Sequence, residues 1–200
     1  MNEKDYLHTI CRKGHHKILQ KHILNGKEDL NKEDERGLTP LHYACLKGHI
    51  KVAELLTTNG ASWNVVTKSD GLSPLYIACL NNHLEIVKIL LEHQADPEQV
   101  NFEGRTPLHV SCQNGCLQIA KHLIENGLAD LNNIDNNGRS PLYYASMNGH
   151  IEVVKFLVEY GANIHQITNS DETIVYKAHS YGHQDVVEFL LEKGAKLCES

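Results

Sequence analysis

The chain has 200 residues, 41% of them hydrophobic, and a formal net charge of −6 at pH 7. This hydrophobic content is typical of a soluble domain that buries a core of its own. The excess of acidic residues argues against non-specific binding to nucleic acid, which depends on Lys and Arg contacts to phosphate groups. No window approaches the run of about 18 apolar residues that a membrane span needs.

Residues 1–31 are predicted to form two short helices at the start of the chain. Leu7, Ile10 and Cys11 give the first helix one apolar face, and Gly14-His15 separates it from the second. The remaining surface of the second helix is polar. An end unit must face water on one side, so this segment is predicted to be an N-terminal cap.

Four full units follow, at residues 32–64, 65–98, 99–132 and 133–165. Each opens its first helix with Thr or Ser before Pro, whose hydroxyl can cap the helix while Pro is tolerated in the first turn. The prolines at 40, 74, 107 and 141 are 34, 33 and 34 residues apart. Each second helix carries one apolar stripe, which cannot bury itself, so neighbouring units are predicted to stack.

Residues 166–200 form a sixth unit that departs from this pattern. It has no proline at the first helix, and Glu172 stands where the turn glycine stood in other units. Gly182-His183 and Gly194-Ala195 keep the register of the repeat. We expect this unit to be the C-terminal cap of a single domain over residues 1–200.

The repeated motifs resemble the ankyrin repeat family over nearly the whole chain. They are the Thr/Ser-Pro-Leu-His/Tyr runs, the Gly-His pairs such as Gly48-His49, and the Leu-Leu-x-x-x-Ala endings such as the one that closes on Ala95. The resemblance implies an all-α solenoid of stacked helix-turn-helix units with short β-turn or hairpin connections. It also implies binding to other proteins, without saying which.

Fourteen histidines could suggest a metal protein, but five of them follow the repeat. His15, His49, His83, His150 and His183 occupy one repeat position. Side chains one repeat apart cannot share an ion whose ligands lie at about 2.0–2.3 Å. We therefore expect each ring to tie one unit to the next by hydrogen bonds, and we expect no metal site.

Two further histidines directly follow the Pro-Leu motif. His42 and His109 hold this position in two units, and Tyr76 and Tyr143 hold it in two others. A catalytic base would not be exchanged for tyrosine from unit to unit. A hydrogen-bonding role in the first helical turn is therefore favoured over a catalytic one.

The cysteines also follow the repeat. Cys11, Cys45, Cys79 and Cys112 hold equivalent positions, which stacked helices should place about 8–10 Å apart, too far for a disulfide. We expect small buried hydrophobic residues in a reducing compartment, the cytoplasm or alternatively the nucleus. The spacing of Cys112 and Cys116 is only a weak metal or redox signal, because no second cysteine pair completes a site.

The acidic runs Glu33-Asp34-Glu35 and Asp171-Glu172 lie in turns, where we expect solvated carboxylates. No Ser-His-Asp set and no glycine-rich phosphate loop can be assembled, so we expect neither enzyme activity nor a cofactor. Trp63, the one tryptophan, is expected to be a half-buried anchor of its hairpin, with an exposed partner contact as the alternative.

By resemblance to ankyrin domains, the positions that flank the turn glycine and the outer side of the first helix line a concave groove. Many of them are apolar, which suggests a binding patch at exposed positions. Ile77 and Val110, at the same positions, are more simply explained by packing between repeats. The candidate partner-binding residues are Leu38, Tyr43, Leu46, Lys47, Leu72, Leu80, Asn81, Phe102, Arg105, Gln113, Arg139, Tyr144 and Met147.

The function we expect is recognition of a protein or peptide through this groove, by a monomer that binds neither nucleic acid nor membrane. One alternative is a structural spacer within a longer multidomain protein. Another is a substrate for modification: by resemblance, Asn31, Asn64 and Asn132 match the hairpin asparagine that is hydroxylated in many ankyrin domains.

Overall fold

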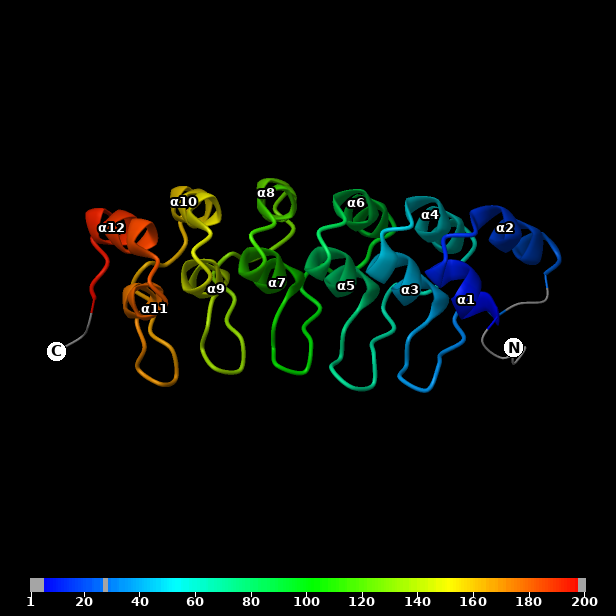
Figure 1. Cartoon of the computed structure of the whole chain (residues 1–200), viewed down its shortest axis with the longest axis horizontal. Helices are drawn as coiled ribbons and strands as arrows, with labels where there is room; N and C mark the ends of the chain where they lie inside the picture. The colour runs from blue at the N-terminus through cyan, green and yellow to red at the C-terminus, as the bar shows by residue number, and fades with distance from the viewer. Residues whose placement is uncertain (1–5, 27–28, 198–200) are drawn as a thin grey trace. The chain divides into compact units, whose positions relative to one another are not determined.

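The computed structural model describes residues 6–26 and 29–197 (Figure 1). Over these residues it contains twelve α-helices, and the β-structure found there is an isolated antiparallel bridge between Ile167 and Thr173. None of the helices in the described ranges is long and apolar enough to cross a membrane. The predicted all-α class built from helix-turn-helix units is confirmed.

The chain divides into two compact parts, residues 1–102 and 103–200, called here the N-terminal half and the C-terminal half. The helices of the N-terminal half are α1 (Tyr6–Arg12), α2 (His16–Leu24), α3 (Pro40–Lys47), α4 (Ile50–Thr58), α5 (Pro74–Leu80) and α6 (Leu84–Glu92). Those of the C-terminal half are α7 (Pro107–Gln113), α8 (Leu117–Glu125), α9 (Pro141–Met147), α10 (Ile151–Glu159), α11 (Ile174–Ser180) and α12 (Gln184–Glu192). The single domain over residues 1–200 stays a prediction.

Each half stacks three helical hairpins. In the N-terminal half α3 contacts α1 and α5, and α4 contacts α2 and α6. In the C-terminal half α9 contacts α7 and α11, and α10 contacts α8 and α12. Within each half the first helices form one row and the second helices another, and the long connecting loops extend from the first row (Figure 1).

The first helices begin where the Thr/Ser-Pro motif predicts. The hydroxyls of Thr39, Ser73, Thr106 and Ser140 each accept a hydrogen bond from the backbone N–H three residues later. Thr173 caps α11 in the same way although no proline follows it. The hydroxyl cap therefore persists in the sixth unit, because it satisfies a helix N–H that has no partner within the helix.

The core consists of the Pro-Leu leucines and the apolar stripes of the second helices. Leu41, Leu75, Leu108 and Leu142 are fully or almost fully buried. The cysteines Cys11, Cys45, Cys79, Cys112 and Cys116 are free thiols and are buried. Burial raises the pKa of the Cys11 thiol to about 12 and raises the pKa of Cys45 further, so both are neutral hydrophobic groups, as predicted.

A glycine at the end of a first helix allows the next hairpin to approach closely. Gly115 has a φ of 68°, and a Cβ built on it would lie 2.7 Å from Nδ1 of His150 in the next hairpin. The ring of His150 in turn donates from Nε2 to the Gln113 carbonyl at 2.9 Å.

Two other histidines of this repeat position make the same bond, one in each half of the chain. Nε2 of His49 donates to the Arg12 carbonyl at 3.0 Å, and Nε2 of His183 donates to the Met147 carbonyl at 3.0 Å. The interpretation of these histidines as links between units is thus confirmed. His15 lies in the first described hairpin, so no described hairpin precedes it to supply the carbonyl acceptor.

Candidate partner-binding surface

The thirteen candidate residues differ widely in exposure. Phe102 is 61% exposed, Leu80 is 37% exposed and Lys47 is exposed as well. Eight others are half-buried: Tyr43, Leu46, Leu72, Asn81, Arg105, Gln113, Arg139 and Met147. Leu38 and Tyr144 are buried, at 7% and 2% exposure, so the expectation that these two lie at exposed positions is wrong.

Tyr144 is buried because its hydroxyl is used inside the protein. It donates to Oδ2 of Asp135 at 2.6 Å. Oδ1 of Asp135 accepts the backbone N–H groups of Asn137 and Arg139 at 2.8 and 2.9 Å. The carboxylate therefore closes the turn before α9, and Tyr144 attaches that turn to the helix.

The N-terminal half repeats this arrangement with less burial. The Tyr43 hydroxyl donates to Oδ2 of Asp34 at 2.8 Å, and Oδ1 of Asp34 accepts from the N–H groups of Arg36 and Leu38. Although desolvation acts to raise it, the pKa of Asp34 is lowered by these hydrogen bonds. Asp34 is therefore a structural carboxylate, and the expectation of a merely solvated acidic run is wrong at this residue.

Glu172 is also more than a solvated turn residue. Its Oε1 accepts a hydrogen bond from Nζ of Lys177 at 2.8 Å, and its Oε2 accepts one from the Tyr143 hydroxyl at 2.6 Å. The Lys177 bond and the Tyr143 bond lower the pKa of Glu172. Burial and the carboxylate together raise the pKa of Tyr143. This residue joins the second and third hairpins of the C-terminal half.

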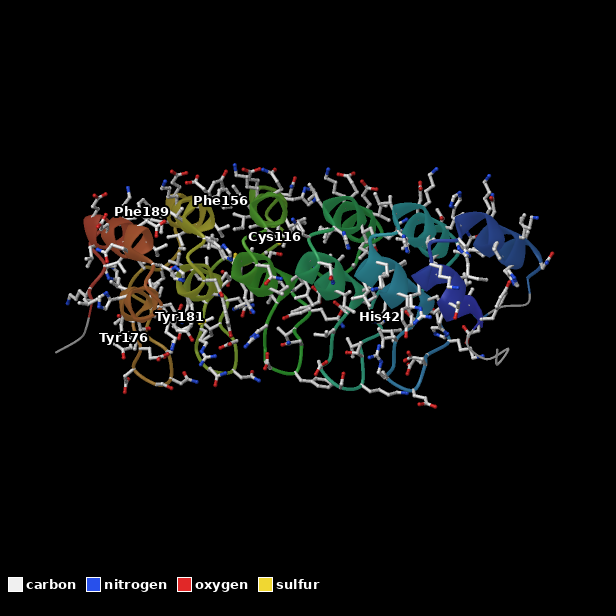
Figure 2. All side chains as sticks on the ribbon, viewed as in Figure 1. His42, Cys116, Phe156, Tyr176, Tyr181 and Phe189 are labelled. Atoms are coloured by element: carbon white, nitrogen blue, oxygen red, sulfur yellow. The ribbon has the colours of Figure 1, made fainter. Side chains whose placement is uncertain are left out.

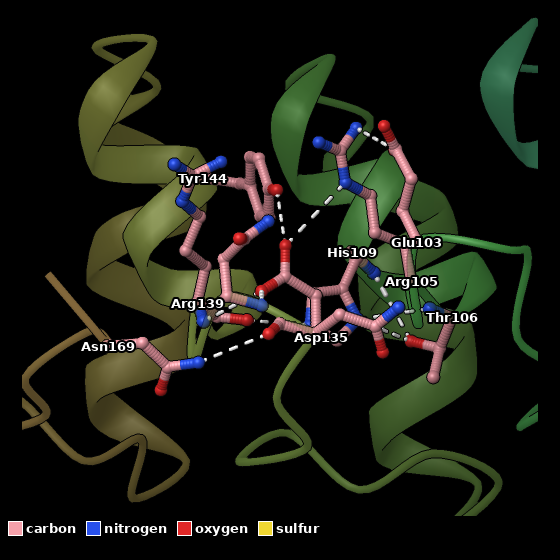
Figure 3. A network of polar contacts seen from close by, with 10 residues as sticks. Glu103, Arg105, Thr106, His109, Asp135, Arg139, Tyr144 and Asn169 are labelled. Atoms are coloured by element: carbon pink, nitrogen blue, oxygen red, sulfur yellow. Dashed lines mark hydrogen bonds and ion pairs between the residues drawn. The ribbon is translucent and has the colours of Figure 1, made fainter.

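Three cations of the C-terminal half lie over tyrosine rings. The guanidinium carbon of Arg105 is 4.7 Å from the ring centroid of Tyr144, and that of Arg139 is 5.7 Å from the centroid of Tyr143. Figure 3 shows Arg105 and Arg139 on opposite sides of Tyr144, with Asp135 below and between them.

The third cation is Lys177 of α11. Its Nζ is 5.6 Å from the ring centroid of Tyr181, and that ring, labelled in Figure 2, is 58% exposed. Arg105 also pairs with Glu103, with 3.1 Å between Nη1 and the carboxylate. We call Arg105, Arg139 and Lys177 the cation ladder.

In the N-terminal half the candidate surface is apolar instead. Leu80 ends α5, and Phe102 follows the loop after α6. The Phe102 N–H donates to the Asp70 carbonyl at 3.0 Å, and its ring covers Gly71, where a Cβ would come within 2.5 Å of it. The backbone bond and this contact fix the base of the ring while its outer part faces solvent.

His42 and His109 act within the first helical turns, as predicted. Nδ1 of His42 accepts from the Thr39 N–H at 3.0 Å, and its Nε2 donates to the Leu72 carbonyl at 3.1 Å. His109 makes the matching bonds to Thr106 and to the Arg139 carbonyl. Burial lowers the pKa of both rings to about 4, so both are neutral at pH 7 and link one hairpin to the next.

The three candidate modification sites are exposed, and the side-chain oxygens of two of them accept hydrogen bonds. Oδ1 of Asn31 accepts from the Ser62 N–H at 2.6 Å, and Oδ1 of Asn132 accepts from the Asn163 N–H at 2.8 Å. The backbone carbonyl of Asn64 accepts from the Gln99 side chain at 3.3 Å.

Trp63 is half-buried, as its interpretation as a hairpin anchor predicts, and its ring centroid lies 6.0 Å from that of His93.

In the described ranges no group of three or more His, Cys, Asp and Glu side chains is arranged to hold a metal ion.

Sequence reasoning missed Asp135, Glu172 and Lys177, which order the candidate surface of the C-terminal half. A signal for the first was present: Asp34 and Tyr43 are nine residues apart, and so are Asp135 and Tyr144. That repeated spacing pairs each acid with its tyrosine. The role of Lys177 had no such signal, because the ring under it has no equivalent in the other units.

A family model for ankyrin repeats, built as three copies, matches residues 2–67, 52–135, 95–168 and 128–200. No curated protein matches the chain.

Proposed function

Because the chain belongs to the ankyrin repeat family, we propose that it binds a partner protein or peptide through the concave surface formed by its first helices and turns, without catalysis. Ankyrin repeats are generally protein–protein interaction modules, and repeat arrays present extended concave surfaces to their partners. Each half contributes candidates that are not buried, and we call these eleven residues the partner surface. The N-terminal half contributes Tyr43, Leu46, Lys47, Leu72, Leu80, Asn81 and Phe102, and the C-terminal half contributes Arg105, Gln113, Arg139 and Met147.

The observation that carries the proposal is the exposure of Phe102 and Leu80 beside buried core. The ring of Phe102 is 61% exposed although its backbone is fixed by a hydrogen bond to Asp70. An apolar side chain that is held still and exposed loses little conformational freedom on binding, which favours an aromatic hot spot.

The experiment is affinity purification from the native cell followed by mass spectrometry. The baits are the wild-type chain, Phe102→Ala, Leu80→Ala and the control Lys88→Ala, whose side chain lies on α6 and pairs with Glu85 at 2.7 Å. We expect proteins that are captured by the wild type and the control but lost from both surface variants. A set of captured proteins that does not change among the four baits would refute the proposal and favour a spacer.

The proposal includes a monomer in a reducing compartment, the cytoplasm or the nucleus, that binds no nucleic acid. Five buried free thiols favour such a compartment, and a net charge of −6 opposes phosphate binding. Localisation of a tagged chain by microscopy, and its mass by light scattering, test these points.

A second candidate is modification of Asn31, Asn64 and Asn132. All three are exposed in hairpin connections, where a modifying enzyme can reach them. Peptide mass spectrometry of protein from its native cell would detect one added oxygen atom per modified asparagine. Unmodified peptides at all three positions would refute this candidate.

A further inference from the structure

The cation ladder brings one positive charge from each of the three hairpins of the C-terminal half. Arg105 precedes α7, Arg139 precedes α9, and Lys177 lies within α11. Each charged group lies over a tyrosine ring, at 4.7, 5.7 and 5.6 Å from the centroid. The negative face of an aromatic ring attracts a cation. The three charged groups are therefore held at defined positions instead of moving freely in solvent.

The side chain of Arg139 is not needed to build the turn in which it lies. Its backbone N–H donates to Oδ1 of Asp135 at 2.9 Å, and its carbonyl accepts from Nε2 of His109 at 3.1 Å. Both bonds use main-chain atoms, so the turn is closed without the guanidinium, which lies over the Tyr143 ring and interacts with the Tyr144 hydroxyl.

The guanidinium of Arg139 also lacks a carboxylate. Among the described residues no acidic oxygen lies within 4.0 Å of its nitrogen atoms, and its Nε is buried without a hydrogen-bond partner. The nearest acids are already engaged: Asp135 accepts from Tyr144 and two N–H groups, and Glu172 accepts from Lys177 and Tyr143. A planar guanidinium is suited to two parallel bonds with a carboxylate, and at Arg139 no carboxylate of the described residues uses that capacity.

Arg105 and Arg139 hold the same repeat position, so the distance between them follows the stacking of α7 and α9 and selects the shape of a ligand. Stacked helices lie about 8–10 Å apart. A polyproline II segment has three residues per turn and rises about 3.1 Å per residue, so residues three apart lie on one edge, separated by about 9 Å. In a β-strand, residues three apart point to opposite faces. In an α-helix the first pair of side chains that lies on one face at a comparable distance is seven residues apart, at about 10.5 Å.

We propose that Arg105, Arg139 and Lys177 bind an extended acidic segment of the partner, in which Asp or Glu recurs at every third residue. This inference rests on the proposed function, because it names the chemistry of the partner that the same protein recognises. Arg139 is the central anchor. Arg105, which already pairs with Glu103 and with Asp135 at 3.7 Å, and Lys177, which pairs with Glu172, bind the flanking acidic groups.

The test is selection from a random peptide library displayed on phage, with the 200-residue chain as bait, followed by anisotropy titrations of the selected peptides. We expect enriched peptides to carry acidic residues three apart. They should bind Arg139→Gln at least about tenfold more weakly, since an interface arginine is a frequent hot spot. The matched control is Lys155→Gln, which removes one positive charge from α10, where Lys155 pairs with Glu152 at 3.0 Å.

A gain-of-affinity variant sharpens the test. Glu103→Gln removes a carboxylate that competes with the peptide for Arg105, so the selected peptides should bind it more tightly. Melting curves of Arg139→Gln should show a cooperatively folded protein with a slightly lower midpoint, since the main-chain bonds of residue 139 remain and the guanidinium contact with the Tyr143 ring is lost.

Three results would overturn the inference. Enriched peptides without regularly spaced acids, acids seven apart, or equal losses with Arg139→Gln and Lys155→Gln each contradict it. If the enriched peptides contradict the inference in one of these ways but bind Phe102→Ala more weakly than the wild type, the proposed function stands and only the inference about the acidic segment fails. If no peptide is enriched, both fail.

Discussion

The hydroxyl of Tyr144 donates to Oδ2 of Asp135 at 2.6 Å, and both side chains are buried. In the N-terminal half the equivalent bond joins Tyr43 to Asp34 at 2.8 Å, with both residues half-buried. The two bonds are chemically alike and differ in their exposure to water. They therefore form a matched pair in which the energetic effect of burial can be measured.

We predict that Tyr144→Phe lowers the free energy of unfolding by about 1–3 kcal/mol, because it removes the hydroxyl donor of a buried carboxylate oxygen whose other partner, Nε of Arg105, lies 3.7 Å away. Tyr43→Phe should cost less, since water can replace the lost hydroxyl at Asp34. Urea unfolding of both variants measures the difference. Equal losses in the free energy of unfolding would mean that burial of the carboxylate does not determine the energy of the bond. Tyr144→Ala should also lower the free energy of unfolding, whereas truncation of an exposed binding residue would leave it nearly unchanged.

The stability of the protein should fall as the pH is lowered from 7 to 5. Burial lowers the pKa of His42 and His109 from 6.5 to about 4 in the folded protein. Between those values the unfolded chain binds protons that the folded chain does not, so stability increases with pH in this window. Each histidine should contribute on the order of 1–2 kcal/mol to the loss of stability between pH 6.5 and pH 5.

The control for this prediction is the double variant His42→Gln, His109→Gln. Glutamine at this position can still complete the capping box but does not titrate. Urea midpoints measured at pH 7, 6 and 5 should fall steeply for the wild type and less for the double variant. Parallel curves for the two proteins would show that other groups cause the pH dependence.

The helix starts could be predicted from the sequence because they depend on local chemistry. Thr39 and Ser73 hold a hydroxyl directly before Pro, and that pattern alone specifies a cap. The burial of Tyr144 could not be predicted, since Tyr43 holds the same repeat position and is half-buried. Arg105 lies over the ring of Tyr144, whereas the edge of His8 meets Tyr43 with centroids 5.7 Å apart. Exposure is thus decided by residues that lie more than thirty positions away in the sequence.

Amide hydrogen exchange should be faster in α12 than in α10. The helix α10 packs against second helices on both sides, α8 and α12, whereas the main packing of α12 with a second helix of the described chain is against α10. In repeat proteins stability is approximately a sum of unit terms and nearest-neighbour terms, so a unit with one neighbour opens more readily. Exchange followed by mass spectrometry at peptide resolution measures this. Equal protection of the two helices would indicate that the C-terminal half opens as one cooperative block.

Gly149 and Gly182 separate the cost of backbone strain from the cost of close packing. Both have positive φ values, 70° and 80°, so alanine is strained at either position, by roughly 1–2 kcal/mol. A Cβ at residue 149 would run into the ring of His183, which is held by its bond to the Met147 carbonyl, whereas a Cβ at residue 182 would meet nothing within 4 Å. We therefore predict that Gly149→Ala lowers the free energy of unfolding clearly more than Gly182→Ala does.

Chemical denaturation of the two variants gives the comparison, and Gly149→Ala combined with His183→Ala supplies the control. Removing the ring should leave little more than the strain of the left-handed backbone at residue 149, so the added cost of alanine there should fall towards that of Gly182→Ala. If the cost of alanine at residue 149 is the same with and without the ring, the approach of the two hairpins is not limited by the glycine–histidine contact. The repeated Gly-His pair would then be maintained by the hydrogen bond of the histidine and by the backbone conformation of the glycine, each acting separately.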